Sequence, residues 1–133
     1  MDANARAAIE ACTAGSLAGT MTFPEVVGRL AAAGVERYHA DLCRAETIFY
    51  LPDGSSHRTA ARTLDEPAAV PFAGPGVVDA IRTVQRGAID YREFCRRIAA
   101  AGCVGYMVSL PGRRVVYYGR TGDSHVEHFP PAP

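Results

Sequence analysis

Hydrophobic residues recur at helical spacing in two stretches of this chain that have similar sequences. Apolar side chains lie three and four positions apart over residues 23–33 and again over 91–101, which predicts two amphipathic helices. Weaker stripes over about 3–14 and 76–86 predict one further helix in front of each. The chain is therefore expected to contain two pairs of consecutive helices.

A different pattern follows each helix pair, because short runs of β-branched and aromatic residues alternate with polar ones and are separated by turn residues. Three short strands are expected in each half of the chain, over residues 36–43, 46–51 and 56–60, and then over 104–110, 114–119 and 124–129. The order helix, helix, strand, strand, strand is thus predicted twice.

The two halves also repeat at the level of single residues. Residues 23–57 align without a gap on residues 91–125, at an offset of 68, and Tyr38 and His57 recur as Tyr106 and His125. A repeat of this length predicts one α+β domain over residues 1–133 with pseudo-twofold symmetry. We expect an antiparallel sheet with helices packed on one face, built from units of about 3–60 and 76–129 and joined by an Ala- and Pro-rich segment, 61–75.

Both central helices begin with the same signal. Thr22 is followed three residues later by Glu25, and Asp90 is followed by Glu93, which predicts a capping box and its aspartate variant. In a capping box the cap oxygen accepts a free amide and the glutamate accepts the amide of the cap residue.

Charge is balanced over the chain but not between its halves. The 14 basic residues are all Arg and match 14 acidic residues, so the net charge is zero. Residues 1–66 carry six Arg and nine acids, a net charge of −3, whereas residues 67–133 carry eight Arg and five acids, a net charge of +3. This asymmetry could orient two copies of the chain, and it is too mild to predict a nucleic-acid partner.

Several features predict a cytoplasmic protein without a membrane partner. No stretch approaches the roughly 18 apolar residues of a membrane span, and the first ten residues do not resemble a secretory signal. The four cysteines have neither a CxxC pair nor zinc-site spacing, so we expect free thiols.

The strand pattern points to a binding surface. Tyr38 and Tyr106 are expected to face the core, but the middle strand of each unit is apolar on both faces, which is unusual for a sheet with one face in water. Part of the second face is therefore expected to be covered, by a loop, a ligand or another chain, and we favour the chain itself or a second copy. The residues predicted to line this second face are His39, Phe49, Met107 and Tyr117.

An alternative site would lie between the two units. His57 and His125 recur in equivalent places, and with Arg120 and Glu127 they could surround a shared cleft. The simpler interpretation is that each histidine flanks a turn. Neither a metal nor a cofactor is expected, because His128 points away from His125 and Glu127 on a strand and a zinc site needs three or four ligands.

Four segments resemble a known family: TFPEVVGRLAAAGVERYHADL, YLPDG, IDYREFCRRIAAAGCVGY and VVYYGRTGDSHVEHFP. They are similar to the YdfO/YbcV-like family of small bacterial and prophage-associated proteins, which is defined as a domain of unknown function. The resemblance implies an α+β fold and no established activity, so no catalytic residue is carried over. Family members are often labelled phage envelope proteins.

Together these observations predict a non-enzymatic binding module that forms a homodimer or binds another protein through the second face of its sheet. The competing hypothesis is a small enzyme or small-molecule sensor with its site between the units. A concave pocket that joins the His57 and His125 turns, with a perturbed histidine, would favour the second hypothesis. A flat apolar sheet face buried against a second chain would favour the first.

Overall fold

The computed structural model describes residues 1–130 and contains two helix pairs and six strands. The predicted order of elements is confirmed. The helices are α1 (Ala3–Ala18), α2 (Phe23–Ala32), α3 (Gly74–Gln85) and α4 (Tyr91–Ala100). The strands are β1 (Arg37–Asp41), β2 (Glu46–Tyr50), β3 (Ser56–Ala60), β4 (Cys103–Ser109), β5 (Arg114–Gly119) and β6 (Ser124–His128).

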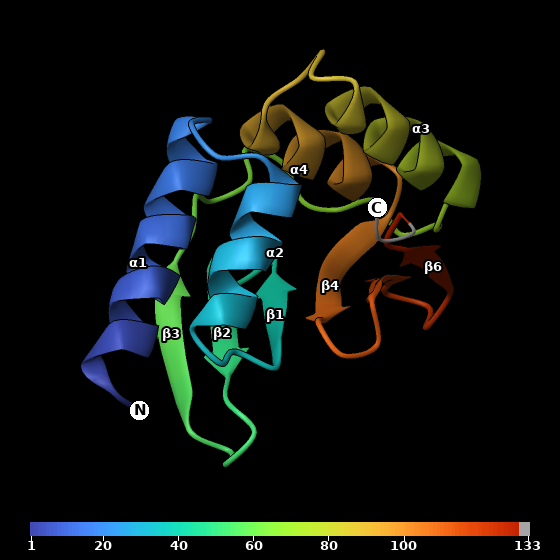
Figure 1. Ribbon diagram of the computed structural model, residues 1–133. Helices are drawn as coiled ribbons and strands as arrows, with labels where there is room; N and C mark the ends of the chain where they lie inside the picture. Colours follow the sequence, from blue (N-terminus) through green and yellow to red (C-terminus); the bar gives the residue numbers. More distant parts are fainter. Residues whose placement is uncertain (131–133) are drawn as a thin grey trace.

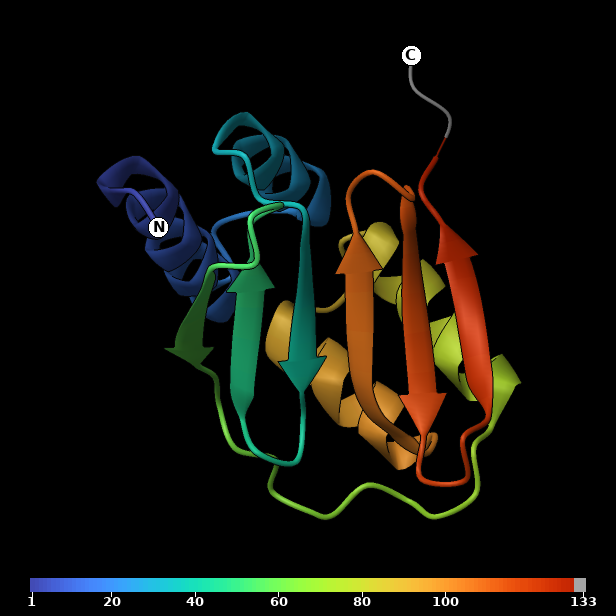
Figure 2. The same ribbon diagram turned by 90° about the horizontal axis from the view of Figure 1, so that it is seen from below.

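The strands form one antiparallel sheet in the order β3-β2-β1-β4-β5-β6, which confirms the α+β class. Figure 2 shows the sheet in front of the four helices, which all lie behind one of its faces. The first unit (residues 3–60) supplies one half of the sheet and the second unit (residues 74–128) supplies the other half. The segment between them, residues 61–73, runs along the end of the sheet from β3 to α3 (Figures 1 and 2).

The pairing of β1 with β4 relates the units in a simple way. His39 pairs directly with Met107, which is the residue at its own position in the repeat, 68 residues further on. A twofold rotation about an axis that passes between these two residues, normal to the sheet, therefore places β1, β2 and β3 on β4, β5 and β6. That the repeat arose by duplication stays a prediction.

The caps that begin the two central helices differ in one respect. Thr22 and Glu25 exchange hydrogen bonds as a capping box, as predicted. Asp90 accepts the amide of Glu93, but the Glu93 carboxylate accepts from Arg96 and Arg97, with no bond back to the amide of Asp90. The predicted second box is wrong in this half, because two guanidinium groups on the same helix compete for the carboxylate.

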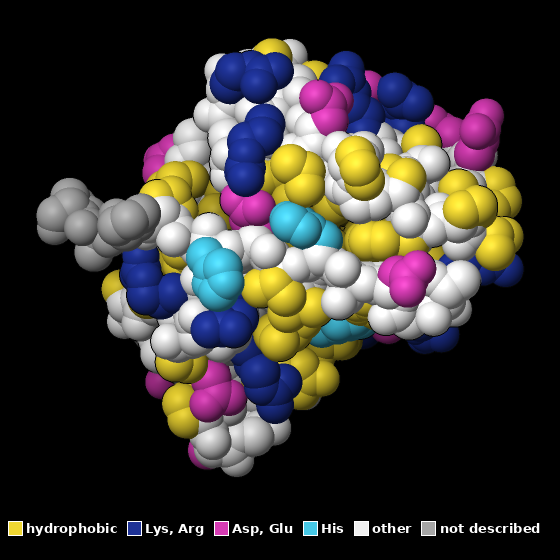
Figure 3. Space-filling model, turned by 90° about the vertical axis from the view of Figure 1, so that its right-hand side faces the viewer, with side chains coloured by type: hydrophobic (Ala, Val, Ile, Leu, Met, Phe, Trp, Pro, Cys, Tyr) yellow, Lys and Arg dark blue, Asp and Glu magenta, His cyan; other side chains and the backbone are white. Residues whose placement is uncertain are grey.

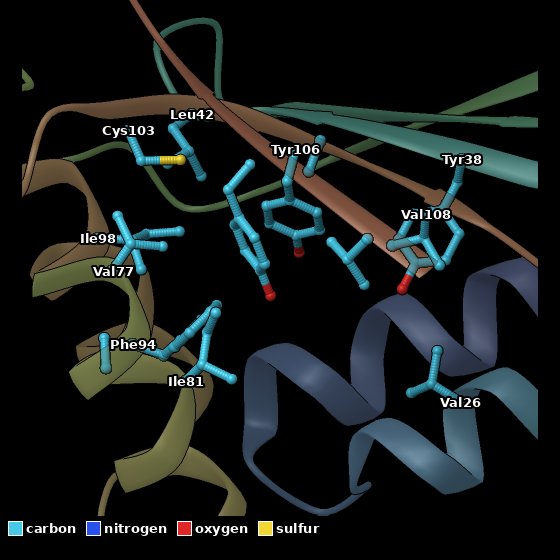
Figure 4. Close-up of a cluster of buried hydrophobic side chains, with 14 of the residues drawn as sticks. Val26, Tyr38, Leu42, Val77, Ile81, Phe94, Ile98, Cys103, Tyr106 and Val108 are labelled. Atoms are coloured by element: carbon cyan, nitrogen blue, oxygen red, sulfur yellow. The ribbon is translucent and has the colours of Figure 1, made fainter. Parts of the chain in front are cut away.

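The core lies between the sheet and the helices. Its most deeply buried side chains include Ile9 and Leu30 from the first unit, and Val77, Ile98 and Val108 from the second. Figure 4 shows Tyr38, Tyr106 and Val108 pointing from the strands toward the helices. Each fully buried aliphatic side chain of this kind contributes roughly 1.5–3 kcal/mol to folding, so this layer is what holds the helices on the sheet.

Candidate functional site

The other face of the sheet is crossed by no described helix or loop (Figure 2), and we call it the open face. Cross-strand partners share a face, so the pairing defines its central row. That row crosses all six strands and consists of Arg58, Ile48, His39, Met107, Val116 and Val126. Four of the six are apolar, and they extend from Ile48 to Val126 over about 19 Å at the usual strand spacing, with His39 between Ile48 and Met107.

Two further rows flank the central row. The row on one side of it includes Arg37, Arg114 and His128. The row on the other side includes Asp41 and Glu46. Glu46 accepts from both Arg44 and Arg58, so its charge is already paired. A tyrosine lies on the face in each unit, Tyr50 in β2 and Tyr118 in β5.

The two tyrosines are equivalent in the repeat but have different neighbours. The Arg37 guanidinium lies 4.0 Å from the centre of the Tyr50 ring. The position equivalent to Arg37 is Gly105, and a Cβ atom there would lie 2.6 Å from the Tyr118 hydroxyl oxygen. The absence of a side chain at Gly105 therefore lets Tyr118 reach across β4, where its hydroxyl lies 2.7 Å from Nε2 of His39.

This hydrogen bond joins the two units on the open face, and the two rings also stack with centres 5.8 Å apart. The sequence pattern did not predict this bond. A glycine inside a strand is a signal for the close approach of another group, and Gly105 carried that signal. Partial burial raises the pKa of the Tyr118 hydroxyl, so Tyr118 stays protonated at neutral pH.

Of the four residues predicted on the second face, two lie there and two do not. His39 and Met107 are neighbours at the centre of the open face. Phe49 and Tyr117 are 4% and 7% exposed and face the helices, because Phe49 pairs with Tyr38 and Tyr117 pairs with Tyr106. The residues that occupy the expected places on the open face are Ile48 and Val116, each one position earlier in its strand.

The predicted cleft around His57 and His125 is not formed. His57 lies on β3 and His125 on β6, the two outermost strands, so the width of the sheet separates them. His57 bonds to Glu10 of α1 at 2.7 Å, and His125 bonds to Glu127 at 3.2 Å. The sequence repeat places the histidines at equivalent positions, but the strand order puts equivalent positions of β3 and β6 at opposite edges.

Glu127 of β6 forms an ion pair with α3. Arg82 of α3 donates to both of its carboxylate oxygens, at 2.7 and 3.4 Å. Partial burial acts to raise the pKa of Glu127, but the hydrogen bonds from Arg82 and His125 outweigh it and lower the pKa. Arg120 is exposed in the turn after β5 and makes no ion pair with any described residue. Figure 3 views the side of the molecule with α3 and β6, where histidine, acidic and basic side chains lie close together.

Three of the four thiols are poor candidates for nucleophilic chemistry, and Cys43 is the exposed one. Burial raises the pKa of Cys95 to about 12 and that of Cys103 to about 11, so both stay protonated at neutral pH. Cys12 is also buried, and its pKa is raised for the same reason. Within residues 1–130, no three potential metal-ligating side chains come together.

A cavity of about 370 Å³ lies on the helix side of the sheet, where the first unit meets α4. We call it the inter-unit cavity. Its walls come from α1, the ends of β1 and β2, the segment after β3 and the first turns of α4, and they include Leu17, Ala40, Thr47, Ala61, Tyr91 and Cys95. Neither His57 nor His125 lines it. A concave site between the units therefore exists, at a place that the sequence analysis did not predict.

Comparisons with known proteins give relatives without an assigned activity. Residues 76–127 match the profile of a family described as "Protein of unknown function (DUF1398)". Over 108 residues the chain is 29% identical to uncharacterized proteins of Mycobacterium tuberculosis (Rv2012) and Mycobacterium bovis (Mb2035). The match covers 80% of this chain, and it spans only 66% of the length of those relatives.

Neither comparison names the YdfO/YbcV-like family or a phage, so the link to prophages stays a prediction. Among the described residues, each helix is too short or too polar to cross a membrane.

Proposed function

We propose that the protein is a non-enzymatic binding module that pairs with a second copy of itself through the open face. The observation that carries the proposal is the central row, in which Ile48, Met107, Val116 and Val126 lie on a sheet face that no described element covers. Val126 is 40% exposed, Ile48, Met107 and Val116 are partly exposed, and an apolar surface of this kind marks an interaction site.

The charges of the two halves indicate how the copies would be arranged. The first unit carries five Arg and six acids, a net charge of −1, and the second unit carries eight Arg and five acids, a net charge of +3. Stacking the first unit of each copy on the second unit of the other therefore brings −1 opposite +3 in both places. Stacking each unit on its own equivalent would oppose like charges. In the favoured arrangement His39 lies opposite Met107 of the second copy, and Ile48 lies opposite Val116 of the second copy.

The size of the face sets the expected strength of the pair. Six strands of about five residues give a face of about 24 Å by about 17 Å. Stable dimers bury about 800 Å² on each partner, and a face of this size, about 400 Å² in projection, is about half of that. We therefore expect a dimer that dissociates on dilution.

The test is the solution mass measured by light scattering over a series of concentrations. The wild-type mass should rise toward that of a dimer, and Met107→Arg should stay monomeric, because its guanidinium would lose water in the apolar row. Ala7→Arg, on the exposed surface of α1, is the matched control and should dimerise like the wild type. A monomeric wild type would contradict self-pairing and would favour a host protein as the occupant, as the resemblance to prophage-associated proteins suggests.

Chemical cross-linking tests the arrangement separately. In a Cys43→Ser background, which removes the exposed thiol, chains with Ile48→Cys are mixed with chains with Val116→Cys and treated with a short bismaleimide. The mixture should give the mixed dimer, and each variant alone should give little product. Efficient cross-linking of Ile48→Cys to itself would show that each unit stacks on its own equivalent.

A further inference from the structure

The inter-unit cavity has a counterpart in the other half of the molecule, which the pseudo-twofold axis relates to it. The wall positions Ala40, Thr47, Ala61 and Tyr91 correspond, 68 residues away in the repeat, to Val108, Val115, Phe129 and Phe23. We call these four counterpart residues the filled corner. Two of the four cavity positions, Ala40 and Ala61, carry smaller side chains than their counterparts, and the other two, Thr47 and Tyr91, carry more polar ones.

The side chains of the filled corner indicate which chemical groups would fit in the inter-unit cavity. Val108 and Val115 are 0% and 3% exposed and form its floor. The Phe129 ring lies edge-on against Phe23, with ring centres 5.5 Å apart and an angle of 80° between the planes. In the cavity the floor is Ala40 and Thr47, Tyr91 stands in the place of Phe23, and Ala61 supplies no ring. The empty space thus corresponds to an aromatic ring and several methyl groups.

The rim of the cavity contains acids and arginines, but most of the acids are already engaged. Glu93 is paired with Arg96 and Arg97, and Glu46 with Arg44 and Arg58. Asp41 and Asp90 accept backbone amides at the ends of their elements.

Two rim arginines are less engaged. Arg92 lies 4.0 Å from Asp65, and both side chains are largely exposed. Arg62 makes no ion pair with any residue in the described part of the chain. Asp41, Asp65 and Asp90 keep their negative charges, so the rim carries charges of both signs, and Arg62 is the one charged lining residue that makes neither a hydrogen bond nor an ion pair with another described residue.

We propose that the inter-unit cavity binds a small carboxylate that carries an aromatic ring. The ring takes the place that Phe129 occupies in the filled corner, with its edge or face against Tyr91, and the carboxylate lies between Arg62 and Arg92. A volume of about 370 Å³ lies within the range of small-molecule sites, roughly 300–1,000 Å³. Arginine suits this role because its planar guanidinium can donate two parallel hydrogen bonds to a carboxylate.

The walls of this site lie on the opposite side of the sheet from the central row of the open face, and the two surfaces share only Asp41 and Glu46 at the rim. The cavity walls come from both units, so a bound ligand would tie α4 to the first unit. The inference therefore stands or fails separately from the proposed self-pairing.

The test is an NMR titration of the isotope-labelled chain with 3-phenylpropionate as the probe. We expect saturable shifts of the amides of Ala40, Ala61 and Tyr91. 3-Phenylpropylamine, which has the same ring and the opposite charge, should bind at least about tenfold more weakly, a difference of about 1.4 kcal/mol. Equal binding of the amine would contradict the proposed preference for a carboxylate. The absence of saturable shifts at millimolar concentrations of the probe would contradict the proposed site.

Two variants locate the bound probe. Ala61→Phe places a ring where the probe's ring would lie, and it should weaken binding at least about tenfold. Ala7→Phe adds the same ring on an exposed surface of α1 and should leave binding unchanged. Arg62→Ala, which leaves the walls intact, should weaken the acid severalfold and leave the weak binding of the amine unaffected. Undiminished binding to Ala61→Phe would show that the probe binds elsewhere.

Discussion

The filled corner and the inter-unit cavity occupy equivalent places in the two-unit fold, but the filled corner is packed with side chains and the inter-unit cavity is hollow. Phe129 closes the first against Phe23, whereas Ala61 leaves the second open beside Tyr91. The turn after the first strand of each unit has the same conformation, because Ala45 and Arg113, which are equivalent, are the two non-glycine residues with positive φ among those described. At the equivalent positions of their walls, the two corners differ in side-chain size, so the same arrangement of helices and strands accommodates a packed corner and a hollow one.

The largest effect is expected from opening the floor of the filled corner. Val108→Ala removes two buried methyl groups and leaves a void, which should lower the free energy of unfolding by about 2–3 kcal/mol. Chemical denaturation at a fixed low protein concentration measures this. Ala40→Val, the reciprocal change at the equivalent position, is the matched variant and should cost less than about 1 kcal/mol, because it adds volume beside a cavity. Equal losses in the two variants would show that both floors are equally packed.

A smaller loss is expected from removing the ring that closes the filled corner. Phe129→Ala should lower the free energy of unfolding by about 1–2 kcal/mol, because the aromatic pair with Phe23 contributes about 0.5–1.5 kcal/mol beyond the area that it buries. Phe129 is only partly buried, which keeps the loss below that of a fully buried ring. Phe129→Leu should restore part of the loss. Wild-type stability of Phe129→Ala would mean that the ring does not support the corner.

The reciprocal change should act in the opposite direction. Ala61→Phe supplies the missing ring next to Tyr91 and should raise the free energy of unfolding by about 0.5–1 kcal/mol, as cavity-filling changes commonly do. The same denaturation experiment measures it, with Ala7→Phe as the control on an exposed surface. A loss of stability would show that the cavity is too shallow for a ring, and it would also count against the ligand class proposed for it.

The sequence predicted the helices, the strands and their order better than it predicted which residues lie on each face of the sheet, and the reason is physical. Helical and alternating spacing repeat in both halves, so the elements and their order could be predicted. Which face of β2 and β5 meets the core could not be predicted from alternation, because Ile48 and Phe49 are both apolar, as are Val116 and Tyr117. That choice depends on pairing with Tyr38 and Tyr106, which is a contact between strands.

The candidate sites depended on long-range placement in the same way. Equivalence in the repeat suggested that His57 and His125 lie together, but only the pairing of β1 with β4 decides which equivalent positions meet, and those are His39 and Met107. The cavity did have a signal in the sequence. Aligning the repeat shows Ala61 opposite Phe129 and Ala40 opposite Val108, and such differences in size between repeat copies mark positions where the packing of the copies differs.

The smallest effect concerns the glutamates that begin α2 and α4, which are equivalent but differently bound. Arg96 and Arg97 lower the pKa of Glu93 to about 2, whereas the cap of Thr22 lowers the pKa of Glu25 by less. A carboxyl with a lowered pKa stabilises the fold above its unfolded pKa, near 4.5, and loses this contribution as the pH falls toward about 2. The melting temperature of Glu93→Gln should therefore fall less steeply than that of the wild type between these pH values. Glu25→Gln should reduce the pH dependence of the melting temperature less than Glu93→Gln does. An equal effect of the two variants would mean that Arg96 and Arg97 add nothing to the effect of the cap.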